Sequence, residues 1–115
     1  LFEETGAIVA ALTTSVPESP DSQRNWDYRY CWLRDAYFTV HALNSVSATK
    51  TMERFIAYVA NVIALERGPA LKPVYAILPE TALTERTASA LAGYRGHGPV
   101  KVGNAAVAAR TGEAA

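Results

Sequence analysis

Apolar side chains recur at helical spacing in two neighbouring stretches of the chain, residues 35–46 and 50–67. The first stretch predicts a helix with Asp35 as its N-cap, and the second predicts a helix that ends at Gly68. Because a short connector joins them, we expect the two helices to form an antiparallel pair. The apolar positions are Ala36, Val40, Leu43 and Val46 in the first stretch and Met52, Phe55, Ile56, Val59, Val62 and Ile63 in the second.

The remaining segments are shorter and more mixed in character. Two apolar runs, residues 7–13 and 74–78, predict short strands. Residues 82–92 are rich in alanine and predict a weak helix, and Asn104 is a candidate cap for a last helix over 105–110. Residues 15–24 and 93–99 are rich in turn-forming residues and predict loops. The chain is therefore expected to be mainly α, with short strands or loops near its N-terminus.

Aromatic and polar side chains alternate between residues 26 and 32, just before the first predicted helix. An extended backbone places Trp26, Tyr28, Tyr30 and Trp32 on one face, and Asp27, Arg29 and Cys31 on the other. Aromatic rings fit the apolar faces of a pyranose, and the neighbouring ionic pair Arg34 and Asp35 could bind its hydroxyl groups. A buried aromatic strand with structural ion pairs explains the same pattern, so these residues alone leave both interpretations open.

Composition narrows the class of protein. Half of the residues are apolar and 19% are charged, which is too apolar for a disordered chain. A net charge of zero argues against nucleic-acid binding, and the absence of a long apolar run argues against a membrane span. One cysteine and two histidines without neighbouring ligand residues predict neither a disulfide scaffold nor a metal site, and we expect no cofactor.

Three segments match a known pattern in the expected order. The strongest is Arg24–Ala36, which reads RNWDYRYCWLRDA; it follows the lead-in Thr5–Glu18 and precedes Leu91–Ala106, which reads LAGYRGHGPVKVGNAA. Together they resemble glycoside hydrolase family 15, the glucoamylase and bacterial trehalase-like enzymes. Because the three segments span nearly the whole chain, the resemblance is far more specific than any one motif, and it favours the sugar-binding interpretation.

The resemblance implies an (α/α)₆ barrel that hydrolyses α-glucosidic bonds, such as those of trehalose or maltose, with inversion by two glutamates. It implies that Arg34 and Asp35 bind hydroxyls of the terminal glucose, that Tyr28 faces the reacting ring and that Trp32 walls the pocket. Tyr94 and Arg95 would lie on the leaving-group side. The resemblance places the two catalytic glutamates beyond Ala115, so we expect no catalytic residue within residues 1–115.

We therefore expect residues 1–115 to be a partial catalytic domain, incomplete at both ends, that contains the first barrel helices. Glu80 and Glu85 lie outside the matching motifs, and we expect them to be solvated. The helix faces that include Met52, Phe55 and Val59 would be exposed and could cause self-association. No signal peptide is visible, which favours the cytoplasm. Two other hypotheses remain, a non-catalytic carbohydrate-binding module and a remnant without function.

Overall fold

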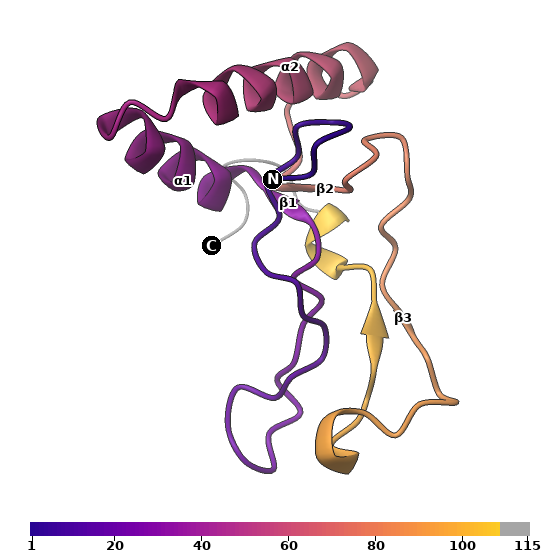
Figure 1. Cartoon of the computed structure of the whole chain (residues 1–115). Helices are drawn as coiled ribbons and strands as arrows, with labels where there is room; N and C mark the ends of the chain where they lie inside the picture. Colours follow the sequence, from indigo (N-terminus) through magenta and orange to yellow (C-terminus); the bar gives the residue numbers. More distant parts are fainter. Residues whose placement is uncertain (109–115) are drawn as a thin grey trace.

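The computed structural model describes residues 1–108, and two helices dominate its regular structure (Figure 1). The helices are α1, Leu33–Ser45, and α2, Thr49–Leu65. Two small antiparallel sheets pair β1, Cys31–Trp32, with β2, Val74–Tyr75, and β3, Arg86–Thr87, with β4, Lys101–Val102. Two 3₁₀ turns are η1, Tyr94–Gly96, and η2, Ala105–Ala108. The predicted pair of helices is confirmed, and α1 and α2 lie against each other as a hairpin.

Helix α1 begins earlier than predicted, and Asp35 is not its N-cap. Trp32 is the capping residue and makes no side-chain cap hydrogen bond. The N–H of Leu33 instead donates to the carbonyl of Pro73 at 3.1 Å, because β1 runs directly into the helix beside β2. The residue that precedes β2 therefore accepts a helix N–H that a capping side chain usually accepts. Asp35 lies in the first helical turn, and its carboxylate accepts a hydrogen bond from the Arg34 side chain.

The face of α2 that packs on the core includes a residue, Phe55, that was expected to be exposed. Phe55, Tyr58 and Val62 are buried, so the expectation that Phe55 is exposed is wrong. Phe55 packs into the cluster that also contains Cys31 and Ala36. The exposed apolar residues of this helix include Ile56 and Ile63, each 57% exposed. The helix spacing was sufficient to predict an apolar helix, but its wide apolar arc did not reveal which side faces the core.

The predicted strand over residues 7–13 does not form. The N–H groups of Ala10 and Ala11, which are adjacent, donate to the carbonyls of Tyr30 and Tyr28. Regular antiparallel pairing uses every second residue, so this arrangement is an irregular, bulged pairing of two extended segments. It still holds the aromatic segment against the N-terminal part of the chain.

The weak helix predicted over residues 82–92 is also wrong. The chain there is extended or turns, and β3 pairs Arg86 with Val102. Pairing with β4 outweighs a modest helix propensity that no apolar stripe supports. The cap predicted at Asn104 is present, since its side-chain oxygen accepts the N–H of Ala106 at 2.9 Å, but the turn that follows is the 3₁₀ turn η2. Residues 109–110 of that predicted helix lie outside the described residues.

The core lies between the helical hairpin and β1–β2. Tyr58 is fully buried there, and its hydroxyl donates to the carbonyl of Ala76 at 2.7 Å. A second, smaller cluster under η2 contains Val74, Ala76 and Leu83, and Trp32 packs against it. Within residues 1–108, neither helix has the length and apolar character of a membrane span.

Candidate functional site

The structure brings four of the six predicted site residues to one open cavity of about 380 Å³. Its volume lies within the range of roughly 300–1,000 Å³ that small-ligand pockets occupy. The residues come from the aromatic segment, the first turn of α1, the residue that precedes β3, and the start of η2 with the residue before it. The lining is formed by Trp26, Tyr28, Trp32, Arg34, Asp35, Glu85, Asn104, Ala105 and Ala106.

An ion pair borders this cavity at the start of α1. The Nε of Arg34 donates to Oδ1 of Asp35 at 3.2 Å, and the guanidinium carbon lies 5.9 Å from the centre of the Trp32 ring. Because Asp35 lies in the first helical turn, the positive end of the helix dipole favours its negative charge. Both side chains remain partly exposed, so one donor and one acceptor are held side by side and stay accessible to a ligand.

The two tryptophans of the chain form walls that other residues hold in place. Trp32 packs against the smaller core cluster. The Nε1 of Trp26 donates to Oε1 of Glu18 at 3.0 Å, and the Lys101 ammonium lies 4.3 Å from the centre of the Trp26 ring. Trp26 lines the cavity and Lys101 does not. The ammonium of Lys101 therefore leaves part of the Trp26 ring uncovered, and this part borders the cavity. Packing thus supports the Trp32 ring, and a hydrogen bond and the Lys101 ammonium support the Trp26 ring.

The aromatic segment is anchored by Asp27, whose side chain is completely buried. Its carboxylate accepts two hydrogen bonds from the Arg29 guanidinium at 2.9 Å and one from the N–H of Gly103 at 3.2 Å. Burial opposes ionisation, but the bonds from Arg29, Tyr30 and Gly103 outweigh it and lower the pKa of Asp27 below its ordinary value. This charged network ties the segment to the turn that precedes η2.

Three of the four aromatic rings that were predicted to share one face of the aromatic segment line the cavity. Trp26, Tyr28 and Trp32 line it, whereas Tyr30 lines a separate hollow beside Gly103. None of the three residues between these rings, Asp27, Arg29 and Cys31, lines the cavity. Burial raises the pKa of the Cys31 thiol to about 11, so this cysteine is protonated and packs in the core.

Two cavity residues were missed by the sequence analysis. Glu85 was expected to be solvated, and Asn104 was considered only as a helix cap. The hydrogen bond from the N–H of Asn104 to the carbonyl of Leu83 at 2.8 Å brings their two segments together beside the cavity. Pairing of residues 86–87 with residues 101–102 is what places Glu85 beside the cavity. The sequence analysis predicted a helix over residues 82–92 and therefore did not consider this pairing.

Tyr94 and Arg95 are not brought to this cavity. They line a different hollow with residues 16–20 and His97. Figure 1 shows the η1 turn that carries them at the end of the molecule away from the helices, whereas η2 lies beside β1. Their predicted role on the leaving-group side stays a prediction.

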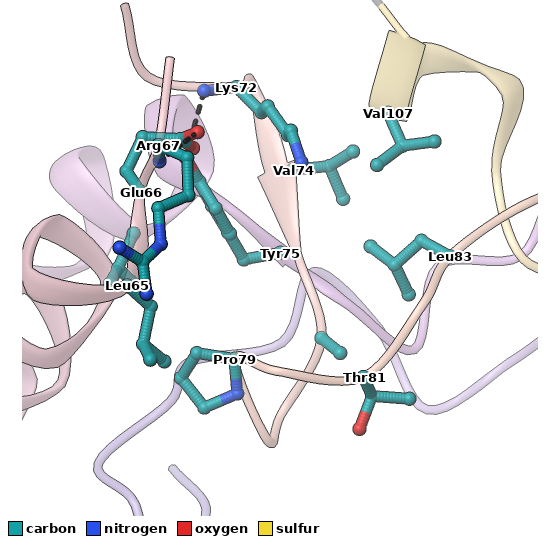
Figure 2. A pocket seen from close by; sticks show the side chains of 12 residues that line it. Leu65, Glu66, Arg67, Lys72, Val74, Tyr75, Pro79, Thr81, Leu83 and Val107 are labelled. Carbon is teal, nitrogen blue, oxygen red and sulfur yellow. Dashed lines mark hydrogen bonds between the residues drawn. The ribbon is translucent and has the colours of Figure 1, made fainter.

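A further cavity, of about 170 Å³, lies where α2 ends beside β2 (Figure 2). The hydroxyl of Tyr75 donates to Glu66 at 2.6 Å and accepts the N–H of Lys72 at 2.9 Å. Burial, followed by the adjacent Glu66 carboxylate, raises the pKa of Tyr75 to about 12. The polar groups of Glu66 and Tyr75 are thus bonded within the fold, and we interpret this network as a structural end to α2.

The first cavity combines ring walls with an accessible ion pair and two further polar side chains, Glu85 and Asn104. Such an arrangement suits a polyhydroxylated ring, because apolar C–H faces lie against aromatic rings while hydroxyls bond to charged groups. Among residues 1–108, no three His, Cys, Asp or Glu side chains come together in a way that could hold a metal ion. The chemistry of the lining therefore suits a sugar as the ligand.

Comparison with known proteins agrees with this chemistry. Residues 2–109 match the Glycosyl hydrolases family 15, and the chain belongs to this family. It is 40% identical over 108 residues to a trehalase of Mycobacterium tuberculosis, 37% over 107 residues to one of Mycolicibacterium smegmatis, and 38% over 106 residues to one of Thermoplasma acidophilum. These alignments cover 91–92% of the chain but only 16–18% of the relatives. No solved structure matches it significantly.

Proposed function

We propose that the protein hydrolyses α-glucosidic bonds, with trehalose as the substrate that its relatives suggest, and that this chain supplies the glucose-binding part of the site. The observation that carries the proposal is the shared cavity of Tyr28, Trp32, Arg34 and Asp35. In it, Trp32 stacks on the apolar face of the terminal glucosyl ring. Arg34 donates to its hydroxyls, Asp35 accepts from them, and Tyr28 faces the reacting carbon.

We further propose that the reaction inverts the anomeric carbon and that the two catalytic glutamates lie outside this chain. An inverting mechanism needs one carboxylic acid at the leaving oxygen and one carboxylate that activates water on the opposite face. The chain spans about a sixth of the length of the trehalases that it matches, so most of such an enzyme lies outside it. On this view α1 and α2 are the first helices of an (α/α)₆ barrel, and Tyr94 and Arg95 approach the leaving group.

The chain is expected to bind trehalose without hydrolysing it. A residue that transfers a proton contributes about 10²–10⁴-fold to the rate, and the proposal places both such residues elsewhere. Asp35→Asn should weaken binding about tenfold, since a hydrogen bond to a charged acceptor is worth about 1.5–3 kcal/mol. Tryptophan fluorescence during titration measures the affinity, and glucose release measures hydrolysis.

Asp21→Asn is the matched control, because the Asp21 side chain is 94% exposed and lies outside the cavity. It should leave the affinity for trehalose unchanged. Equal loss of affinity in both variants, or no binding of trehalose or glucose by the unaltered chain, would contradict the proposed role. Hydrolysis by the unaltered chain would contradict the placement of the catalytic glutamates.

A further inference from the structure

We infer that Glu85 is a second carboxylate of the sugar cavity, one that accepts a hydroxyl and makes the site selective for neutral sugars over anionic ones. The inference rests on the proposed function, since it assumes that a sugar occupies this cavity. It concerns a residue that neither the sequence motifs nor the family match assigns to binding.

The position of Glu85 follows from strand pairing on both sides of it. Arg86 pairs with Val102 in the β3–β4 ladder, and the carbonyl of Leu83 accepts the N–H of Asn104. Residue 85 is therefore held opposite the turn that leads from β4 to η2. From there its side chain lines the cavity together with Asp35 and Arg34.

Glu85 is half-buried, and among residues 1–108 its carboxylate has neither a hydrogen bond nor an ion pair. The fold itself therefore gives this carboxylate no structural role. Partial removal of a carboxylate from water is unfavourable unless donors replace the lost water, and the hydroxyls of a bound sugar are such donors. Asp35 differs, because Arg34 already donates to it at 3.2 Å.

The charges that line the cavity favour a neutral ligand. Arg34 contributes one positive charge, and Asp35 and Glu85 contribute two negative charges. The Lys101 ammonium lies over the Trp26 ring but does not line the cavity. With the negative charge in excess, an anionic sugar is repelled, whereas the hydroxyls of a neutral sugar can donate to both carboxylates.

Glucose and glucuronate form the test pair, because glucuronate replaces the C6 alcohol by a carboxylate with little change in size. Titrated by tryptophan fluorescence, the unaltered chain should bind glucose roughly tenfold more tightly than glucuronate. Glu85→Gln should weaken glucose binding about fivefold, since a charged acceptor forms a hydrogen bond about twice as strong as a neutral one. It should also bring the ratio of the two affinities close to one.

Two further variants complete the experiment. Glu85→Asp keeps the charge but shortens the reach, so it should weaken glucose binding and retain the preference over glucuronate. Glu80→Gln is the matched control, because Glu80 is exposed and lies outside the cavity, and it should behave like the unaltered chain. Circular dichroism should show the same melting temperature for Glu85→Gln, since among the described residues Glu85 has no partner to lose.

The outcomes separate this inference from the proposed function. If the unaltered chain binds neither sugar, both fail. If it binds glucose and Glu85→Gln changes neither the affinity nor the preference, the inference alone fails. If the chain hydrolyses trehalose and Glu85→Gln abolishes turnover at unchanged affinity, Glu85 transfers a proton and its assignment as a hydroxyl acceptor is overturned.

Discussion

Gly103→Ala is expected to destabilise the chain by more than about 3 kcal/mol. Gly103 has a φ of +88°, and a Cβ there would overlap the carbonyl oxygens of Leu83 and Thr84. Backbone atoms cannot move aside without separating residues 83–84 from the turn after β4. Because that separation also moves Glu85 and Asn104, sugar binding should be lost together with stability. Thermal unfolding should show a decrease in melting temperature of at least roughly 10 °C.

Gly96→Ala provides the matched control for this prediction. Gly96 also has a positive φ, +75°, but a Cβ there would have no neighbour within 4 Å. It should therefore cost only about 1 kcal/mol, the conformational penalty alone. Similar losses of stability in the two variants would show that the close approach of residues 83–84 to Gly103 does not support the fold.

Asp27→Asn should lower the free energy of unfolding at pH 7 by about 2–4 kcal/mol. The variant replaces a buried acceptor by an amide whose N–H₂ faces donors from Arg29 and Gly103. A small domain has roughly 5–15 kcal/mol of stability in total, so this loss is large. Denaturation by urea, followed by tryptophan fluorescence, measures it.

The same carboxylate makes stability depend on pH in a defined direction. The pKa of Asp27 is lower in the folded chain than its unfolded value of about 3.9, so its stabilisation is complete above that value. It is lost as the pH falls through the folded pKa. Urea denaturation between pH 7 and pH 2 should therefore show a steeper acid loss for the unaltered chain than for Asp27→Asn. Identical pH profiles for these two proteins would contradict the role of Asp27 in the acid loss of stability. The control variant Asp21→Asn, at an exposed position, should lose stability at acid pH as the unaltered chain does.

The local features that the sequence predicted well are those that short-range periodicity determines. The presence of α1 and α2 and their pairing follow from apolar spacing and a short connector, and the rings of Trp26, Tyr28 and Trp32 share a cavity as their alternation predicts. The features that it missed depend on contacts between distant segments. Pro73 satisfies the start of α1, and the pairing of β3 with β4 converts a predicted helix into the strand that places Glu85. The residues near Leu33 do not reveal that Pro73 contacts it, and the residues of β3 do not reveal that β4 pairs with them.

The side of each helix that faces the core was also beyond the sequence. Apolar residues occur around most of α2, so spacing alone could not distinguish the buried Phe55 from the exposed Ile56. The contacts with β1 and the N-terminal segment decide this orientation. Asp27 illustrates the same limit, since its alternation with aromatic residues placed it away from the rings but did not predict its bond to Gly103.

The chain contains two tryptophans, Trp26 and Trp32, and both line the proposed sugar cavity. In a ¹⁵N-labelled sample their indole N–H groups give two resonances, one for each tryptophan ring that borders the cavity. Titration with trehalose should shift both resonances along a common binding curve, and Asp35→Asn should move that curve to higher sugar concentration. Two indole resonances that stay unmoved in the folded chain at saturating trehalose would contradict sugar binding at this site.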